Sequence, residues 1–268
     1  ISTSITHAKK RAEERGYGLE VFELEEQGIT PQRLGNIIEA RGIRAALFGP
    51  HSDVTGAIPL KSDKLAMVAL GYSVVEPAMH RVVIDHYRNI HLAMAQLVAR
   101  GYVRIGLMLE KETDARARDL ITAGFWDVGR RFTKTRRLEP YVGPQDKSAI
   151  KKWRAKTKPD AIIGYGGWWH ELLQEIEPFD AESLGYVFLD HFSVEGKSAA
   201  GIPYLNGMLT EVAVDQLVSA LQVNEFGVPP FPRTTSMPCA WQDGPTVRAL
   251  SAPVVDPLFL LPPGIPAN

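Results

Sequence analysis

The sequence lacks the features that would place it in several large classes of protein. It has one cysteine, Cys239, in 268 residues, which excludes an internal disulfide and fits a reducing compartment without proving one. No apolar run is long enough to cross a bilayer. The first ten residues, ISTSITHAKK, show neither the charged nor the apolar part of a secretory signal peptide. We therefore expect a cytoplasmic protein with no membrane partner, and a natural chain that starts earlier.

The sequence also lacks a large net charge and the common motifs of enzymes. The formal net charge is −1, which argues against a nucleic-acid-binding surface in this segment. We find no dinucleotide-binding glycine motif, phosphate loop, zinc-protease motif or nucleophile elbow. The seven histidines are scattered, and no Cys/His pair has metal-ligand spacing. The pairs Asp85-His86 and Asp190-His191 could act as acid/base pairs, but neighbouring strand residues point to opposite faces. We predict no enzymatic activity, no metal and no cofactor.

What the sequence does contain is a repeated alternation of strands and helices. This rhythm predicts parallel α/β structure, and the number of units indicates two sheets in tandem. Helices are expected at residues 5–17, 30–42, 62–70, 87–100, 119–132, 146–156, 168–176 and 210–221. Strands are expected at 18–24, 43–49, 71–75, 80–84, 104–109, 136–143, 159–167, 185–192 and 233–241. The Pro-rich end, residues 252–268, should form an irregular wrap.

The clearest unit is residues 80–109, HRVVIDHYRNIHLAMAQLVARGYVRIGLML. An apolar strand ends at Asp85-His86, and an amphipathic helix follows, with Gly101 where a left-handed C-terminal cap is needed. The run RIGLML then suits a parallel strand that is covered on both faces. Ligands of open parallel sheets bind beyond the carboxyl ends of the strands, which is where Asp85 and His86 would lie.

In this order the segments resemble the effector-binding core of LacI-family transcription regulators, which have the type I periplasmic-binding-protein fold. The resemblance rests on the collinear order of KKRAEERGYGLEVF, IRAALFGP, VVIDHYRNIHLAMAQLVARGYVRIGLM, LITAGFWDV, KPDAIIGYGG, LGYVFLD and WQDGPTVR. It implies two Rossmann-like subdomains with parallel sheets, joined by three crossovers. We expect one subdomain at 1–107 plus 206–227, and the other at 108–205 plus 228–268. The family's helix-turn-helix and first, central strand are not in this sequence, so we expect both upstream.

The resemblance also implies a ligand cleft, and several polar residues are candidates to line it. Asp85 and Asp190 are carboxylates at strand ends that could accept hydrogen bonds from sugar hydroxyls. Asp85 could instead cap the following helix. His86 and His191 follow these carboxylates and could line the cleft or be ordinary loop residues. His51, after LFGP, is a further candidate. Asn206 could contact the ligand or cap a helix.

Departures from the family pattern affect the expected ligand. Sugar-binding members carry an arginine where this chain has Ile121, and Arg118 could replace it or be a solvated surface residue. The family's Asn-Asp pair is Gly166-Gly167 here, followed by Trp168 and Trp169. Either tryptophan could stack on a sugar ring or fill the core; we choose Trp168 as the ligand candidate. These losses leave open whether sugar binding is retained.

Together these expectations describe the ligand-sensing and dimerisation domain of a bacterial LacI-type regulator. A small effector, a carbohydrate in our hypothesis, would bind between the subdomains and control operator binding by the missing N-terminal domain. The regulator would act as a homodimer that presents paired DNA-binding heads. The alternative is the solute-binding protein of a sugar transporter, which shares the fold. The sequence does not identify the effector, the operator or the sign of regulation.

Overall fold

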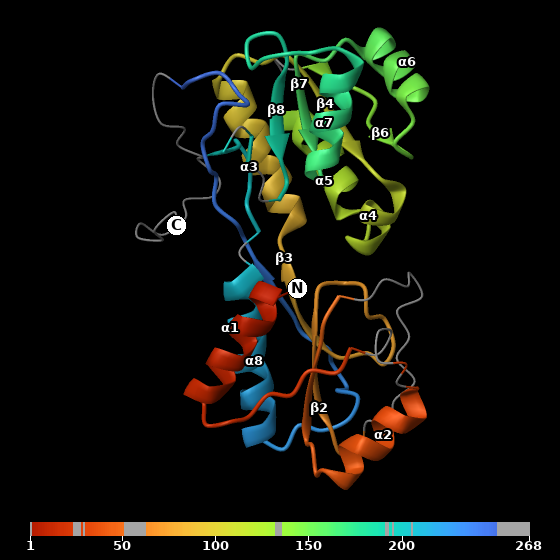
Figure 1. Ribbon diagram of the computed structural model, residues 1–268, viewed down its shortest axis with the longest axis vertical. Coiled ribbons are helices and arrows are strands. Elements are labelled where there is room, and N and C mark those ends of the chain that lie inside the picture. The colour runs from red at the N-terminus through yellow and green to blue at the C-terminus, as the bar shows by residue number, and fades with distance from the viewer. Residues whose placement is uncertain are drawn as a thin grey trace. The chain divides into compact units, whose positions relative to one another are not determined.

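The computed structural model divides the chain into two compact units. It describes residues 2–23, 28, 30–50, 63–131, 136–190, 193–194, 196–204 and 206–250. Unit 1 comprises Ile1–Ile84 and Leu205–Met237, and unit 2 comprises Asp85–Tyr204 and Pro238–Asn268. The chain passes from one unit to the other three times, as the resemblance implied. Both units are α/β with parallel sheets (Figure 1).

The unit boundaries differ from the expected ones at two of the three crossings. The first was expected near residue 107, but α3 (His86–Ala99) packs on α5 (Leu120–Arg131). In addition, β4 (Arg104–Leu109) pairs with β7 (Ala161–Gly164), so residues 85–107 lie with unit 2. The third was expected near 227, but β11 (Thr234–Met237) pairs with β3 (His80–Ile84) of unit 1. The crossings therefore follow β3 and β11.

The sheet of unit 1 has the strand order β1-β2-β3-β11 and is parallel throughout. β1 is Ala45–Phe48 and β2 is Ala66–Leu70. Helix α8 (Asn206–Gln222) packs on it, and Val68 and Val82 meet Leu217 there. Helix α1 (Ser2–Glu14) lies along α8 (Figure 1). In a separate cluster, Ile38 of α2 (Pro31–Ala40) packs against buried side chains of β2.

Three of the secondary-structure predictions for unit 1 are wrong. Residues 66–70 form the fully buried strand β2 rather than part of a helix, and residues 71–75 form a bend followed by irregular chain rather than a strand. An apolar run in the middle of a parallel sheet has no polar face, so its periodicity cannot distinguish helix from strand. Residues 18–23 form no strand; Leu19 instead packs its side chain against α1 and α8.

The sheet of unit 2 has the order β5-β4-β7-β8, and β6 also pairs with β4. β5 is Arg136–Arg137, β6 is Tyr141–Val142 and β8 is Gly185–Phe188, so the single strand expected at 136–143 is two short strands. Helices α6 (Lys147–Thr157) and α7 (Gly167–Ile176) pack on one sheet face through a core that includes Trp153, Trp169 and Tyr186. A short helix, α4 (Lys111–Arg116), and a small hairpin of β9 (Ser193–Val194) with β10 (Lys197–Ser198) were not expected.

The remaining predicted helices and strands are confirmed to within a few residues. Thr30 caps α2 by accepting a hydrogen bond from the amide of Arg33, and Gly42 and Gly101 adopt the positive φ of 63° and 80° expected after a helix. The predicted wrap at 252–268 lies outside the described residues. Within the described ranges, no helix is long and apolar enough to cross a membrane.

An arginine at the C-terminal end of α3 holds segment 241–248 of unit 2. The side chain of Arg100 is 0% exposed and donates to Asp243 Oδ1 (2.5 Å), Gln96 Oε1 (2.5 Å) and the carbonyl of Arg248 (2.9 Å). Its guanidinium also lies 5.1 Å from the ring centre of Trp241. Charge-assisted hydrogen bonds thus hold the segment WQDGPTVR, residues 241–248, against the C-terminal end of α3.

Candidate functional site

The carboxyl ends of three parallel strands meet at one edge of the unit 2 sheet. Met108, Gly164 and Phe188 are neighbours in the registers of β4, β7 and β8. The residues that follow these strands include Tyr165 and Asp190. A later segment reaches the same edge, because the amide of Ile202 donates to the carbonyl of Phe188 (2.8 Å). It carries Tyr204, so the edge collects side chains from distant parts of the chain.

Four side chains form what we call the edge cluster: His86, Tyr165, Asp190 and Tyr204. The rings of Tyr165 and Tyr204 lie 5.8 Å apart, and their hydroxyls share a hydrogen bond. The Oη of Tyr204 is 3.4 Å from Nδ1 of His86. Burial, together with the negative charge of Asp190, raises the pKa of both tyrosines. Both phenols are therefore protonated near neutral pH and can donate hydrogen bonds.

The imidazole of His86 is neutral at physiological pH. Burial lowers its pKa to about 4, and the nearby charge of Asp85 opposes this only in part. A neutral imidazole has one nitrogen that accepts and one that donates. The edge cluster thus combines one carboxylate with three uncharged hydrogen-bonding groups, a set that suits hydroxyl-rich neutral molecules better than ions.

Asp85 has the capping position that the sequence left open. It precedes α3, and its Oδ1 accepts a hydrogen bond from the amide of Arg88 (2.9 Å). Such a cap satisfies one of the helix's free amides. Its role in ligand binding stays a prediction.

The two tryptophans that follow Gly166-Gly167 have different environments. Trp169 is 0% exposed and packs in the core with Tyr141, their ring centres 5.9 Å apart. Trp168 is 41% exposed. Its indole covers Gly166, where a Cβ would lie 2.4 Å from the ring and where φ is +89°. Only glycine combines that conformation with that contact. Trp168 is therefore the tryptophan with surface available for stacking.

The resemblance predicts an arginine at position 121, and this chain has no cation there. Ile121 is 1% exposed, so it is a core residue of α5. Arg118 is exposed and lies in a turn with φ of 57°. A different cation, Arg116 at the end of α4, is close enough to Tyr165 to lower that tyrosine's pKa slightly against the effect of burial.

Other candidates are only partly located. His51 and His191 lie outside the described residues. Asn206 begins α8 in unit 1, and its side chain is among those not described. Sequence reasoning missed Tyr165 and Tyr204. For Tyr165 a signal existed, because it directly follows a buried strand in YGG, whereas nothing marked Tyr204 before its segment was placed beside β8. In the described part of the chain, no group of three or more His, Cys, Asp or Glu residues could hold a metal ion.

No protein-family model and no curated protein sequence matches the chain. Several solved structures, however, are similar to this chain in fold. A LacI family transcriptional regulator from Enterococcus faecium with bound ribose is 12% identical, with a TM-score of 0.65 over 92% of this chain and 93% of that one. A periplasmic binding protein/LacI transcriptional regulator from Alkaliphilus metalliredigens QYMF, complexed with D-xylulofuranose, is 14% identical, with a TM-score of 0.64 over 92% and 94%. The lactose repressor bound to the anti-inducer ONPF is 16% identical, with a TM-score of 0.64 over 92% and 94%. The chain therefore has the fold of LacI-family effector-binding cores.

Proposed function

We propose that this chain is the ligand-sensing core of a LacI-type transcription regulator and that it binds a neutral sugar at the edge cluster. The observation that carries the proposal is the convergence of Tyr165, Tyr204, a neutral His86 and Asp190 at the carboxyl ends of the unit 2 strands. Ligands of open parallel sheets bind at that edge. The fold and the sugars bound to two similar proteins support the same conclusion.

The chemistry of the cluster favours a neutral sugar over a sugar acid. A carboxylate accepts hydrogen bonds from two hydroxyls, and the tyrosines and imidazole add donors and an acceptor. The exposed ring of Trp168 offers an apolar face of the kind that packs on a sugar ring. Ile121 in place of the arginine expected from the resemblance removes one cation that could hold a carboxylate.

As a regulator, the protein would act in the cytoplasm as a homodimer. Sugar binding would shift an equilibrium between two arrangements of the units, and the DNA-binding heads of the full-length regulator would read that shift. The coupling requires that the sugar bind the two arrangements with different affinity. In this function the chain needs no catalytic group and no cofactor.

A thermal-shift screen against neutral monosaccharides, disaccharides, sugar acids and nucleosides tests the binding. A ligand at about a hundred times its dissociation constant adds roughly 2.7 kcal/mol of stability. Asp190→Asn should abolish the shift. Asp63→Asn, in an exposed turn of unit 1, is the matched control and should keep it. A hit that survives Asp190→Asn would place the sugar elsewhere, and a shift only with sugar acids would contradict the neutral class.

The regulatory half of the proposal needs the full-length protein. Operator DNA affinity, measured by fluorescence anisotropy with and without the sugar found in the screen, should change by about 5- to 150-fold, the range of typical couplings. Unchanged affinity at saturating sugar would contradict allosteric control. A binding hit with a secretory leader in place of the DNA-binding domain would favour the transporter alternative.

A further inference from the structure

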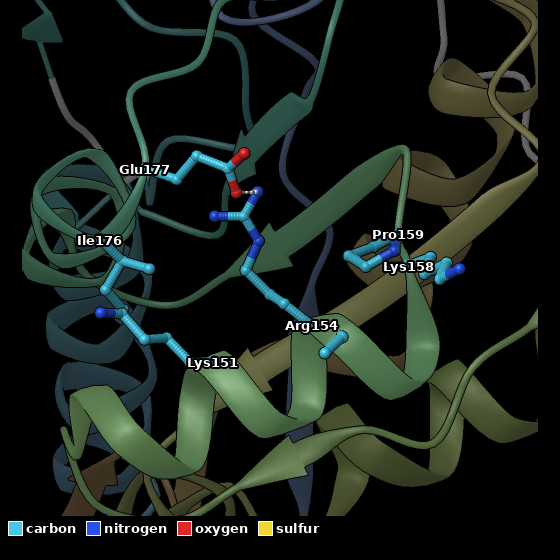
Figure 2. A pocket seen from close by; sticks show the side chains of 7 residues that line it. Lys151, Arg154, Lys158, Pro159, Ile176 and Glu177 are labelled. Atoms are coloured by element: carbon cyan, nitrogen blue, oxygen red, sulfur yellow. Dashed lines mark ion pairs between the residues drawn. The ribbon is translucent and has the colours of Figure 1, made fainter.

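We propose that unit 2 has a second binding site, for a small phosphate-bearing ligand, in the pocket between the C-terminal ends of α6 and α7. The pocket has a volume of about 300 Å³ and is lined by Lys151, Arg154, Ala155, Lys158, Pro159, Ile176 and Glu177 (Figure 2). α6 ends just before β7 begins, and α7 ends before β8 begins. The pocket is therefore at the amino ends of the strands, opposite the edge cluster.

Arg154 is the central residue of this pocket. Its side chain is 17% exposed, and its Nη2 lies 3.2 Å from Oε2 of Glu177. Figure 2 shows the guanidinium reaching from α6 to that carboxylate. The other nitrogen, Nη1, is buried and has no hydrogen-bond partner among the described residues. A buried donor without an acceptor is costly, so Arg154 is a partly buried cation whose hydrogen-bonding capacity is not fully used by Glu177.

More positively than negatively charged side chains also line the pocket. Three cations, Lys151, Arg154 and Lys158, line it against one carboxylate, that of Glu177. Residues 147–158, KSAIKKWRAKTK, contain no acidic side chain. Within the described parts of the chain, neither lysine of the pocket has a recorded ion pair, whereas Lys147 outside it pairs with Glu175 (2.8 Å). The excess positive charge favours a ligand with more than one negative charge.

A simpler explanation would be that these cations only offset the partial negative charge of two helix C-termini. The hydrogen bonds argue against it. The last carbonyls of α6, those of Thr157 and Lys158, already accept hydrogen bonds from the side chain of Arg104. At the end of α7, the carbonyl of Leu173 accepts from the amide of Glu177 (3.0 Å). Carbonyls at both helix ends thus have donors other than Arg154.

The lining residues indicate the class of ligand. Arginine and lysine together form the usual protein environment of phosphate, since the guanidinium binds two oxygens and the ammonium acts as a point charge. Ala155, Pro159 and Ile176 add apolar surface beside the charges. This combination suits a phosphate group attached to a small organic body, and a monocarboxylate would satisfy it poorly.

The test uses inorganic phosphate as the probe, with sodium acetate and sodium chloride at the same ionic strength as comparisons. Binding is measured by isothermal titration calorimetry and by thermal shift on the same chain. Wild type should show saturable stabilisation by phosphate and none by acetate. In Lys151→Gln/Lys158→Gln, phosphate affinity should fall at least tenfold.

The matched control is Lys152→Gln/Lys156→Gln, which removes the same charge from exposed positions of α6 that do not line the pocket. It should bind phosphate like wild type. Equal weakening in both double variants would mean that phosphate only screens the charge of α6, and no saturable binding in wild type would equally overturn the proposal. Sugar binding at the edge cluster is measured separately, so either proposal can fail without the other.

Discussion

Replacing Tyr186 by phenylalanine should raise the stability of unit 2. The ring is 0% exposed, and the Oη has no hydrogen-bond partner among the described residues. Burial, with a contribution from the charge of Asp190, raises its pKa well above the ordinary value. An unsatisfied buried polar group costs about 1–3 kcal/mol. Removing the hydroxyl while keeping the ring should therefore add about 1 kcal/mol to the free energy of unfolding, a little of the gain being lost to the gap it leaves.

Tyr102→Phe is the matched control, because its hydroxyl is fully used. Tyr102 Oη donates to the carbonyl of Ala181 (2.7 Å) and accepts from the amide of Arg248 (3.0 Å). Its removal leaves both partners unpaired and should lower the free energy of unfolding by about 1–3 kcal/mol. The two substitutions are chemically identical but should change stability in opposite directions.

A third variant tests the position of the Tyr186 hydroxyl. A Cβ on Gly164 would lie 1.7 Å from that oxygen, so Gly164→Ala forces the ring to move. Overpacking of this kind costs about 1–3 kcal/mol or more. The cost should be smaller in Tyr186→Phe, with a coupling energy above roughly 0.5 kcal/mol.

Urea denaturation followed by tryptophan fluorescence is a suitable assay. The five tryptophans, Trp126, Trp153, Trp168, Trp169 and Trp241, all belong to unit 2, so the signal reports on the unit that carries the substitutions. If Tyr186→Phe destabilises the protein as much as Tyr102→Phe, the hydroxyl is hydrogen-bonded in the folded state and the reasoning is refuted.

Two further predictions concern charge in unit 2. The folded pKa of His86 is about 4, against 6.5 for an ordinary histidine; the unfolded chain therefore binds more protons between these values, and stability should fall as pH is lowered from about 6.5 to 4. An NMR titration should show the His86 ring largely unprotonated above pH 5. The variant His86→Asn should flatten the pH dependence of the unfolding midpoint. A measured His86 pKa near 6.5 would contradict the burial argument. Arg100→Met should lower the free energy of unfolding by about 1–3 kcal/mol, because it leaves the carbonyl of Arg248 and Oε1 of Gln96 without their donor, whereas Asp243 is exposed enough to be solvated. Lys111→Met, on exposed α4, is the control for urea denaturation, and an equal loss in both would show that the Arg100 network is not stabilising.

The sequence predicted the architecture well where helices had clear ends and failed where apolar runs had none. Residues 80–109 were assigned correctly because Asp85 and Gly101 mark both ends of α3. In contrast, LAMVAL (65–70) has no polar face, and only the neighbouring strands β1 and β3 show that it is a strand. The strand expected at 18–24, GLEVFEL, has apolar residues between its two glutamates, but residues 18–23 pair with no strand. Strand formation depends on partners that local sequence does not contain.

The sequence predicted a candidate site at a sheet edge but not which side chains gather there. The rule that ligands bind at the carboxyl ends of parallel strands led to Asp85 and Asp190. It could not tell that Asp85 caps α3, or that Trp169 enters the core while Trp168 stays exposed. Tyr204 was missed because its position depends on a long-range contact with β8. Such contacts are decided by tertiary packing and have no local signature.

The pairing of α1 with α8 has a consequence for synthesis of the chain on the ribosome. Arg11 donates to Asp215, which is 204 residues later in the sequence. At about 5–20 residues per second, the first helix waits roughly 10–40 s for its partner to be translated. Strand β11, the last neighbour of β3, emerges later still. Residues 85–204 of unit 2 leave the ribosome during that wait. Nascent unit 1 therefore stays incomplete, and accessible to chaperones and proteases, while most of unit 2 is being translated.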